Sequence, residues 1–402
     1  HYLASQAGLD ILRRGGTAID AAVATAFAVG VCEPWLSGIG GCGMMTVYMK
    51  DTHDYEVLEY METVPVAVQP GWYNPETDVA TAKNAAVPGQ VMGLLTALEK
   101  YGTMSREEVM APAIKLARDG FAMEKRLADA IADNYDNFNE EGLAIYTNDG
   151  IPYAEGDLFK NEPLANTLQT IADGGIDAFY NGELADKMVE GLQANGSLMA
   201  KEDLASYTVA EREPIRTTYY GYEVVTVPPP SNGGDWLLEM LNIMENKDIK
   251  QYDVNSLDYL YVYNEACRIA LTDSYSYIGD PAFFNLPVDQ MISKEFAAER
   301  AQLIDVDNKA AMEEVPKSNL PVEKLDPTAE DSKHTTHIAV IDQYGNIVST
   351  TNTLGNGWGC KFLAPGLGFY YNSHIGNLDH SNPDSPDYVM PGKRVRSTIS
   401  PS

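Results

Sequence analysis

The sequence has little positive charge, few cysteines and no long apolar run. It contains 28 Lys and Arg against 58 Asp and Glu, a formal net charge of −30. A surface this acidic repels phosphate backbones and anionic lipids, so nucleic acid is disfavoured as a partner. The most apolar stretch, residues 18–31, carries Asp20 and is shorter than the roughly 20 residues of a membrane-spanning helix. It predicts a buried core helix and no membrane span.

The cysteines are scattered along the chain: Cys32, Cys42, Cys267 and Cys360. No C-x-x-C pair occurs, which excludes the usual local zinc and redox motifs. The cysteines do not indicate the cellular compartment. His334 and His337 could suggest a metal site. Residues three apart in a strand point to opposite faces, so these histidines converge poorly on one ion. We therefore expect no metal ion and no cofactor.

With 402 residues, 45% of them hydrophobic, the chain can form one large domain or two average ones. It starts without Met and without a basic-then-apolar leader, so we expect a removed targeting segment or a missing start. A helix is predicted over residues 3–14. The glycine cluster at 37–43 lacks a following Lys-Ser/Thr, which favours close backbone packing over a phosphate loop.

The character of the chain changes near residue 334. Residues 305–333 are charged and contain proline, and predict a flexible surface connector. Residues 337–341 and 347–353 then predict two strands joined by a turn at 342–346. Thr335 and Thr336 stand at the start of this hairpin. A threonine that becomes the first residue of a chain can use its own α-amine as the base that activates its hydroxyl.

Many ordered matches show that the chain resembles the γ-glutamyltranspeptidase (glutathione hydrolase) family over essentially its whole length. The stretches that carry the resemblance are 3–9, 14–23, 37–41, 87–89, 112–121, 228–234, 335–337, 342–346, Asn372 and 397–401.

The resemblance implies an α+β fold, a four-layer αββα sandwich of the N-terminal-nucleophile hydrolase type. It implies autoproteolysis of a zymogen between His334 and Thr335, into a large segment (1–334) and a small one (335–402) of one domain. Thr335 would attack a γ-glutamyl or related amide to form an acyl-enzyme, resolved by water or an amino-acid acceptor. Thr353 matches the threonine that supports this nucleophile. An extracytoplasmic location is favoured on the resemblance alone.

Several positions that would bind the glutamyl group differ from the family pattern. Met61 occupies the position of an arginine that pairs with the substrate carboxylate, a bidentate contact that methionine cannot make. The expected asparagine after Thr353 falls on Gly355, with Asn356 beside it. His374 and Asn377 align with the glutamine and aspartate that hold the amine, and an amide lacks the charge to balance an ammonium.

Ser397 and Thr398 keep the hydroxyl pair that contacts the substrate carboxylate in the family. Arg394 and Arg396 could replace the lost arginine, although we expect two solvated basic residues. Residues 378–394, which form a lid in many members, are short and rich in Asp, Asn and Pro, which suggests an open pocket.

The chain stops at Ser402, before the strands and glycine pair that supply the oxyanion hole in the family, so we expect it to be truncated.

Three hypotheses about the function stay open. The protein is a γ-glutamyl enzyme with a rebuilt pocket, a family acylase with another acyl substrate, or an unprocessed, non-catalytic homologue. The lost polar contacts disfavour glutathione as the substrate.

Overall fold

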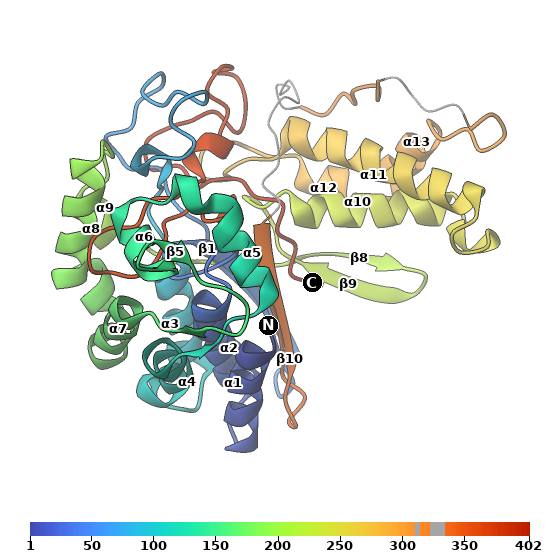
Figure 1. Cartoon of the computed structure of the whole chain (residues 1–402). Helices are drawn as coiled ribbons and strands as arrows, with labels where there is room; N and C mark the ends of the chain where they lie inside the picture. Colours follow the sequence, from blue (N-terminus) through green and yellow to red (C-terminus); the bar gives the residue numbers. More distant parts are fainter. Residues whose placement is uncertain (310–313, 322–333) are drawn as a thin grey trace.

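The computed structural model describes residues 1–309, 314–321 and 334–402 (Figure 1). Most of the connector predicted over 305–333 therefore lies outside the described residues. Among those described, no helix is both long and apolar enough to cross a membrane.

An antiparallel five-stranded sheet, in the order β10-β11-β1-β2-β7, forms the centre of the molecule. Its strands are β1 (Cys42–Met49), β2 (Asp54–Tyr60), β7 (Ala210–Arg212), β10 (His334–Ile341) and β11 (Ile347–Gly355). The predicted hairpin is β10–β11. Its turn is closed by Asp342, whose carboxylate accepts hydrogen bonds from the N–H groups of Tyr344 and Asn346 at 2.9 and 3.0 Å. Residues on both sides of the His334–Thr335 bond thus contribute to one sheet.

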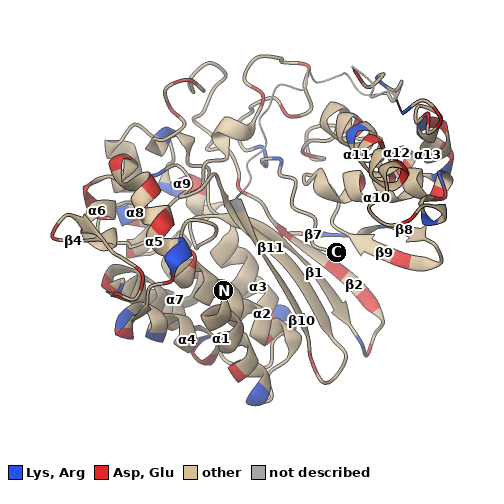
Figure 2. Ribbon diagram, turned by 45° about the vertical axis from the view of Figure 1, so that its right-hand side comes forward, with Lys and Arg blue, Asp and Glu red and all other residues tan. Residues whose placement is uncertain are grey.

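Helices cover one face of this sheet (Figures 1 and 2). This part of the chain contains α1 (Tyr2–Arg13), α2 (Ala18–Cys32), α3 (Gln90–Tyr101), α4 (Arg106–Asp119), α5 (Lys125–Asn134), α6 (Glu140–Tyr146), α7 (Glu162–Tyr180), α8 (Glu183–Ala194) and α9 (Lys201–Ala205). The predicted core helix is α2, which is buried along its length except at Gly30. Its acidic residue, Asp20, is tolerated inside because it caps the helix with Thr17 and accepts hydrogen bonds from Thr103.

A second, smaller unit packs on the other face of the sheet. It contains the hairpin β8 (Ile215–Tyr219) and β9 (Tyr222–Thr226), with α10 (Gly233–Asn246), α11 (Leu257–Tyr277), α12 (Val288–Met291) and α13 (Lys294–Ala301) beyond it. Apolar side chains from both units meet between the sheets, among them Met44, Val57, Val227 and Ile399. Figure 2 shows the resulting order of helices, sheet, sheet and helices. The α+β class and the αββα order are confirmed, although β8 and β9 are the whole second sheet among the described residues.

Short elements complete the chain: β3 (Phe121–Ala122) with β6 (Leu158–Phe159), β4 (Thr147–Asn148) with β5 (Ile151–Pro152), and the 3₁₀ turns η1 (Ala82–Asn84), η2 (Tyr135–Asn137), η3 (Ile249–Gln251) and η4 (Ile375–Asn377).

Candidate active site

Thr335 and Thr353 are partners across the β10–β11 hairpin. The Thr335 hydroxyl donates a hydrogen bond to Thr353 Oγ1 at 3.4 Å, and the Gly355 N–H donates to the same oxygen at 2.9 Å. Thr353 is only 1% exposed, whereas Thr335 is accessible to solvent. The register of the strand shifts between His334 and Thr335, at the bond expected to be cleaved. Such irregularities are frequent beside active sites, where they re-aim a side chain.

A third residue, Cys42 on β1, lies beside the Thr335–Thr353 pair in the sheet. Cys42 is the register partner of Thr353 on the other side, and directly opposed residues of an antiparallel sheet share a face. The approach of β1 to β11 depends on glycine, because a Cβ at Gly41 would lie 2.1 Å from the Thr353 carbonyl oxygen. Close packing of the glycine cluster is therefore confirmed. Asn372 holds the cluster in place by donating hydrogen bonds to Gly40 O and Ala86 O at 3.0 and 2.8 Å.

Three of the predicted substrate-binding positions come together at the end of β11. Gly355 has a φ of 86°, and a Cβ there would lie 3.1 Å from His374 Nε2. The Asn356 N–H donates to Ser373 Oγ at 2.8 Å. Asn356 also lines a cavity of about 430 Å³, together with Trp35, Trp358 and Lys361. The hairpin end therefore adjoins both a buried imidazole and an open space.

The remaining predicted positions are held by other segments. Asn377 ends η4, where its N–H donates to the His374 carbonyl at 3.1 Å. The Ser397 carbonyl accepts from Ser231 Oγ at 2.8 Å, and a Cβ at Gly233 would lie 2.2 Å from the Thr398 carbonyl. Residues 228–234, which lead into α10, therefore position the Ser397–Thr398 pair.

The two arginines near the end of the chain are not solvated, so that expectation is wrong. The Arg394 guanidinium pairs with the fully buried Glu59 at 2.9 Å and also donates to the Met61 carbonyl. Arg396 is 6% exposed and pairs with Asp387 at 3.2 Å. Burial raises the pKa of Glu59, and Arg394 opposes that rise. Each guanidinium already has a buried carboxylate partner, which leaves neither in the role of the missing arginine.

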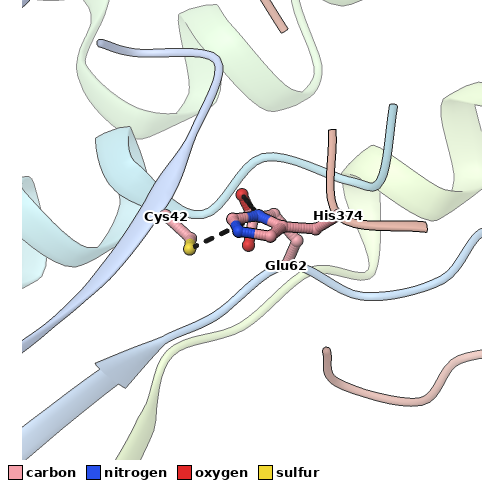
Figure 3. A group of neighbouring side chains, drawn as sticks. All are labelled: Cys42, Glu62 and His374. Carbon is pink, nitrogen blue, oxygen red and sulfur yellow. Dashed lines mark hydrogen bonds and ion pairs between the residues drawn. The ribbon is translucent and has the colours of Figure 1, made fainter. Parts of the chain in front are cut away.

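A cluster that the sequence did not reveal lies behind Thr353. Cys42, Glu62 and His374 are all fully buried and point toward one another (Figure 3). His374 Nδ1 lies 2.9 Å from Glu62 Oε1 and 4.0 Å from Cys42 Sγ, and Met61 Sδ lies 3.6 Å from the same sulfur. Burial and the neighbouring Glu62 raise the pKa of the Cys42 thiol well above its usual value. No local spacing could have signalled this cluster, because it joins three distant segments.

Comparison with known proteins identifies the family to which this fold belongs. The gamma-glutamyltranspeptidase family profile matches residues 4–402. The chain belongs to the gamma-glutamyltranspeptidase family. Its relatives include the glutathione hydrolase proenzyme of Bacillus subtilis (strain 168), 36% identical over 421 residues, covering 100% of this chain and 71% of the relative. The acylase ACY 1 proenzyme of Pseudomonas sp. (strain SE83) is also 36% identical, covering 100% and 72%.

Solved structures support the same family assignment. Cephalosporin acylase from Bacillus halodurans matches with a TM-score of 0.84 and 28% identity, covering 99% of this chain and 72% of that one. Helicobacter pylori gamma-glutamyltranspeptidase matches with a TM-score of 0.74 and 35% identity, covering 76% and 90%. The protein is therefore an enzyme of the N-terminal-nucleophile hydrolase class, made as a precursor, as the sequence predicted.

The structure brings together two positions at which the family resemblance predicts other residues. Met61 and His374, the two clearest departures, both contact Cys42. Both residues therefore belong to the cluster that lies behind the Thr335–Thr353 pair.

Proposed function

We propose that Thr335 is the nucleophile of this gamma-glutamyltranspeptidase family enzyme and that cleavage of the His334–Thr335 bond releases it. The observation that carries the proposal is the 3.4 Å hydrogen bond from Thr335 Oγ1 to the buried Thr353. Cleavage frees the α-amine of Thr335, which can then take up the hydroxyl proton. The resulting subunits correspond to residues 1–334 and 335–402 of the chain.

In the proposed reaction, Thr335 Oγ forms a bond to the carbonyl carbon of a γ-glutamyl or related amide. The C–N bond then breaks, and the leaving amine takes the proton held by the α-amine. Water or an amino-acid amine attacks the resulting ester and restores the Thr335 hydroxyl. The hydrogen bond between the Thr335 and Thr353 hydroxyls orients the attacking oxygen before its proton passes to the α-amine. The cavity beside Asn356 offers room for the leaving group or the acceptor.

Intact mass and N-terminal sequencing test the proposal. Residues 1–402, with a mass of 44.0 kDa, should yield pieces of about 37 and about 7 kDa, the smaller beginning Thr-Thr-His-Ile-Ala. Thr335→Ala should remain uncut and inactive, while Thr336→Ala, one residue further along β10, should still be cleaved. A Thr335→Ala protein that is processed or turns over an amide would remove Thr335 from the mechanism.

A second candidate, an acylase with a non-glutamyl substrate, is favoured by His374, which stands where the family resemblance expects a partner for the substrate's amine and is buried against Glu62. The test compares kcat/KM for γ-glutamyl-4-nitroanilide with that for glutaryl-4-nitroanilide, which lacks only the ammonium. A charged partner for the ammonium contributes about 1.5–3 kcal/mol, which is about 10- to 150-fold in rate. A ratio near one supports the acylase, and a strong preference for γ-glutamyl rejects it.

A further inference from the structure

The buried cluster behind Thr353 offers several metal-ligating atoms at short range. Cys42, Glu62 and His374 each offer one ligating atom, and these three atoms all lie within 4.8 Å of one another (Figure 3). Around a tetrahedral zinc ion, with bonds of about 2.0–2.3 Å, neighbouring donors are about 3.3–3.6 Å apart. The observed 2.9 Å from His374 to Glu62 and 4.0 Å from His374 to Cys42 bracket this range. Small side-chain rotations would bring the three donor atoms to the separations that a tetrahedral zinc ion requires.

The cluster also has unsatisfied polar atoms. Glu62 Oε2 and His374 Nε2 have no hydrogen-bond partner in the part of the chain that the structure describes, and both residues are fully buried. A buried carboxylate with an unpaired oxygen costs free energy, and a cation bound to the same carboxylate would lower that cost by neutralising its charge. One thiolate, one carboxylate and a neutral imidazole balance the charge of a divalent ion. Such an assembly is neutral and suits a buried site.

Met61 offers a fourth donor beside the cluster. Met61 Sδ lies 3.6 Å from Cys42 Sγ, and a thioether is a soft donor. Thiolate and imidazole together favour zinc or copper over magnesium or calcium, which prefer oxygen. We propose that Cys42, Glu62 and His374, with Met61 beside them, bind one divalent transition-metal ion, best matched by zinc, behind the Thr335–Thr353 pair.

The location gives the ion a possible part in substrate recognition. Cys42 is two strands away from Thr335, which corresponds to about 10 Å between their Cα atoms. The ion would lie beside Met61, where the family resemblance expects an arginine that pairs with the substrate carboxylate. A carboxylate at the far end of an acyl chain on Thr335 could take the fourth coordination position in place of the Met61 thioether, so direct ligation rather than net charge would do the work of the arginine. This last step rests on the proposed function, whereas binding of the ion does not.

Metal content is the direct test. The full chain, produced without a histidine tag in zinc-supplemented medium, should contain about one zinc per molecule by plasma mass spectrometry. Binding requires the Cys42 thiolate, so zinc uptake should release its proton to the solvent. Cys42→Ser and His374→Gln should each lose most of the metal. Cys360→Ser, which changes another buried free cysteine, should keep it.

Two further measurements use wild-type protein, so they do not depend on whether the variants fold. Wild-type protein loaded with cobalt should show a thiolate-to-metal charge-transfer band, and added zinc should raise the melting temperature of the wild type. Wild-type protein without stoichiometric metal, or with a cobalt spectrum lacking that band, overturns the proposal. Equal zinc content in wild type and folded Cys42→Ser overturns it as well. Thr335→Ala should bind the metal normally, so loss of the proposed function would leave this result intact.

Discussion

Replacing Thr353 by valine should slow turnover far more than it destabilises the protein. Valine has nearly the same shape as threonine, so packing at this buried position stays filled while the hydroxyl is lost. The Gly355 N–H then loses its acceptor, and an unsatisfied buried donor costs about 1–3 kcal/mol. Thr335 loses the acceptor that orients its hydroxyl. Loss of such positioning in a proton-transfer step should lower kcat by about 100-fold.

Thr351 provides a matched control on the same strand. It is also buried, and its hydroxyl makes one hydrogen bond to a side chain, His337 Nδ1 at 2.8 Å. Thr351→Val should cost about 0.5–1.5 kcal/mol of unfolding free energy and leave kcat nearly unchanged. The assays are chemical denaturation for stability and steady-state hydrolysis of a chromogenic amide for turnover, both on processed enzyme.

The comparison of the two variants decides the role of Thr353. A fall in kcat no larger than that of Thr351→Val would refute the idea that Thr353 supports the nucleophile. A fall that only tracks the unfolded fraction at the assay temperature would do the same. Processing of the precursor should also slow in Thr353→Val, since the same hydroxyl faces the bond to be cleaved.

The remaining predictions concern buried charges near the end of the chain. Arg394→Met should destabilise the fold by about 1.5–3 kcal/mol because Glu59 loses one of two arginine partners and keeps Arg212 at 3.1 Å, whereas Arg216→Met, which breaks an exposed pair, should cost about 0–1 kcal/mol. Equal losses in denaturant would contradict this account. Burial lowers the pKa of Lys393 to about 8 from 10.5. The unfolded chain therefore binds more protons between those values, and Lys393 should make stability rise from pH 8 toward pH 10. In Lys393→Met this contribution should vanish, and unchanged slopes in pH-dependent unfolding would reject the assignment.

Much of the fold follows from patterns that are local in the sequence. The alternation after residue 334 predicted the β10–β11 hairpin, and the helix of residues 18–31 corresponds to α2. These elements are readable because turn chemistry and hydrophobic period act over a few residues. The pairing of Thr335 with Thr353 could be expected for the same reason, since a hairpin with a short turn sets its own register.

Contacts between distant segments could not be read in this way. Arg394 looked like a solvated residue because its sequence neighbours are polar and basic, and only the packed structure places it on Glu59, 335 residues away. Cys42 and His374 are 332 residues apart, and Glu62 and His374 are 312 apart. No spacing rule covers such separations, so a search for local metal motifs could not find this cluster.

The sequence by itself therefore determined the family, the α+β class and the threonine hairpin, all of which depend on short-range order or on ordered motifs. Only the tertiary structure decided where the unusual residues lie. It brings Met61 and His374 onto Cys42 and Glu62, and it places the arginines on buried carboxylates. The physical reason is that burial and ligand geometry are properties of the packed chain, in which residues far apart in sequence share one enclosed space.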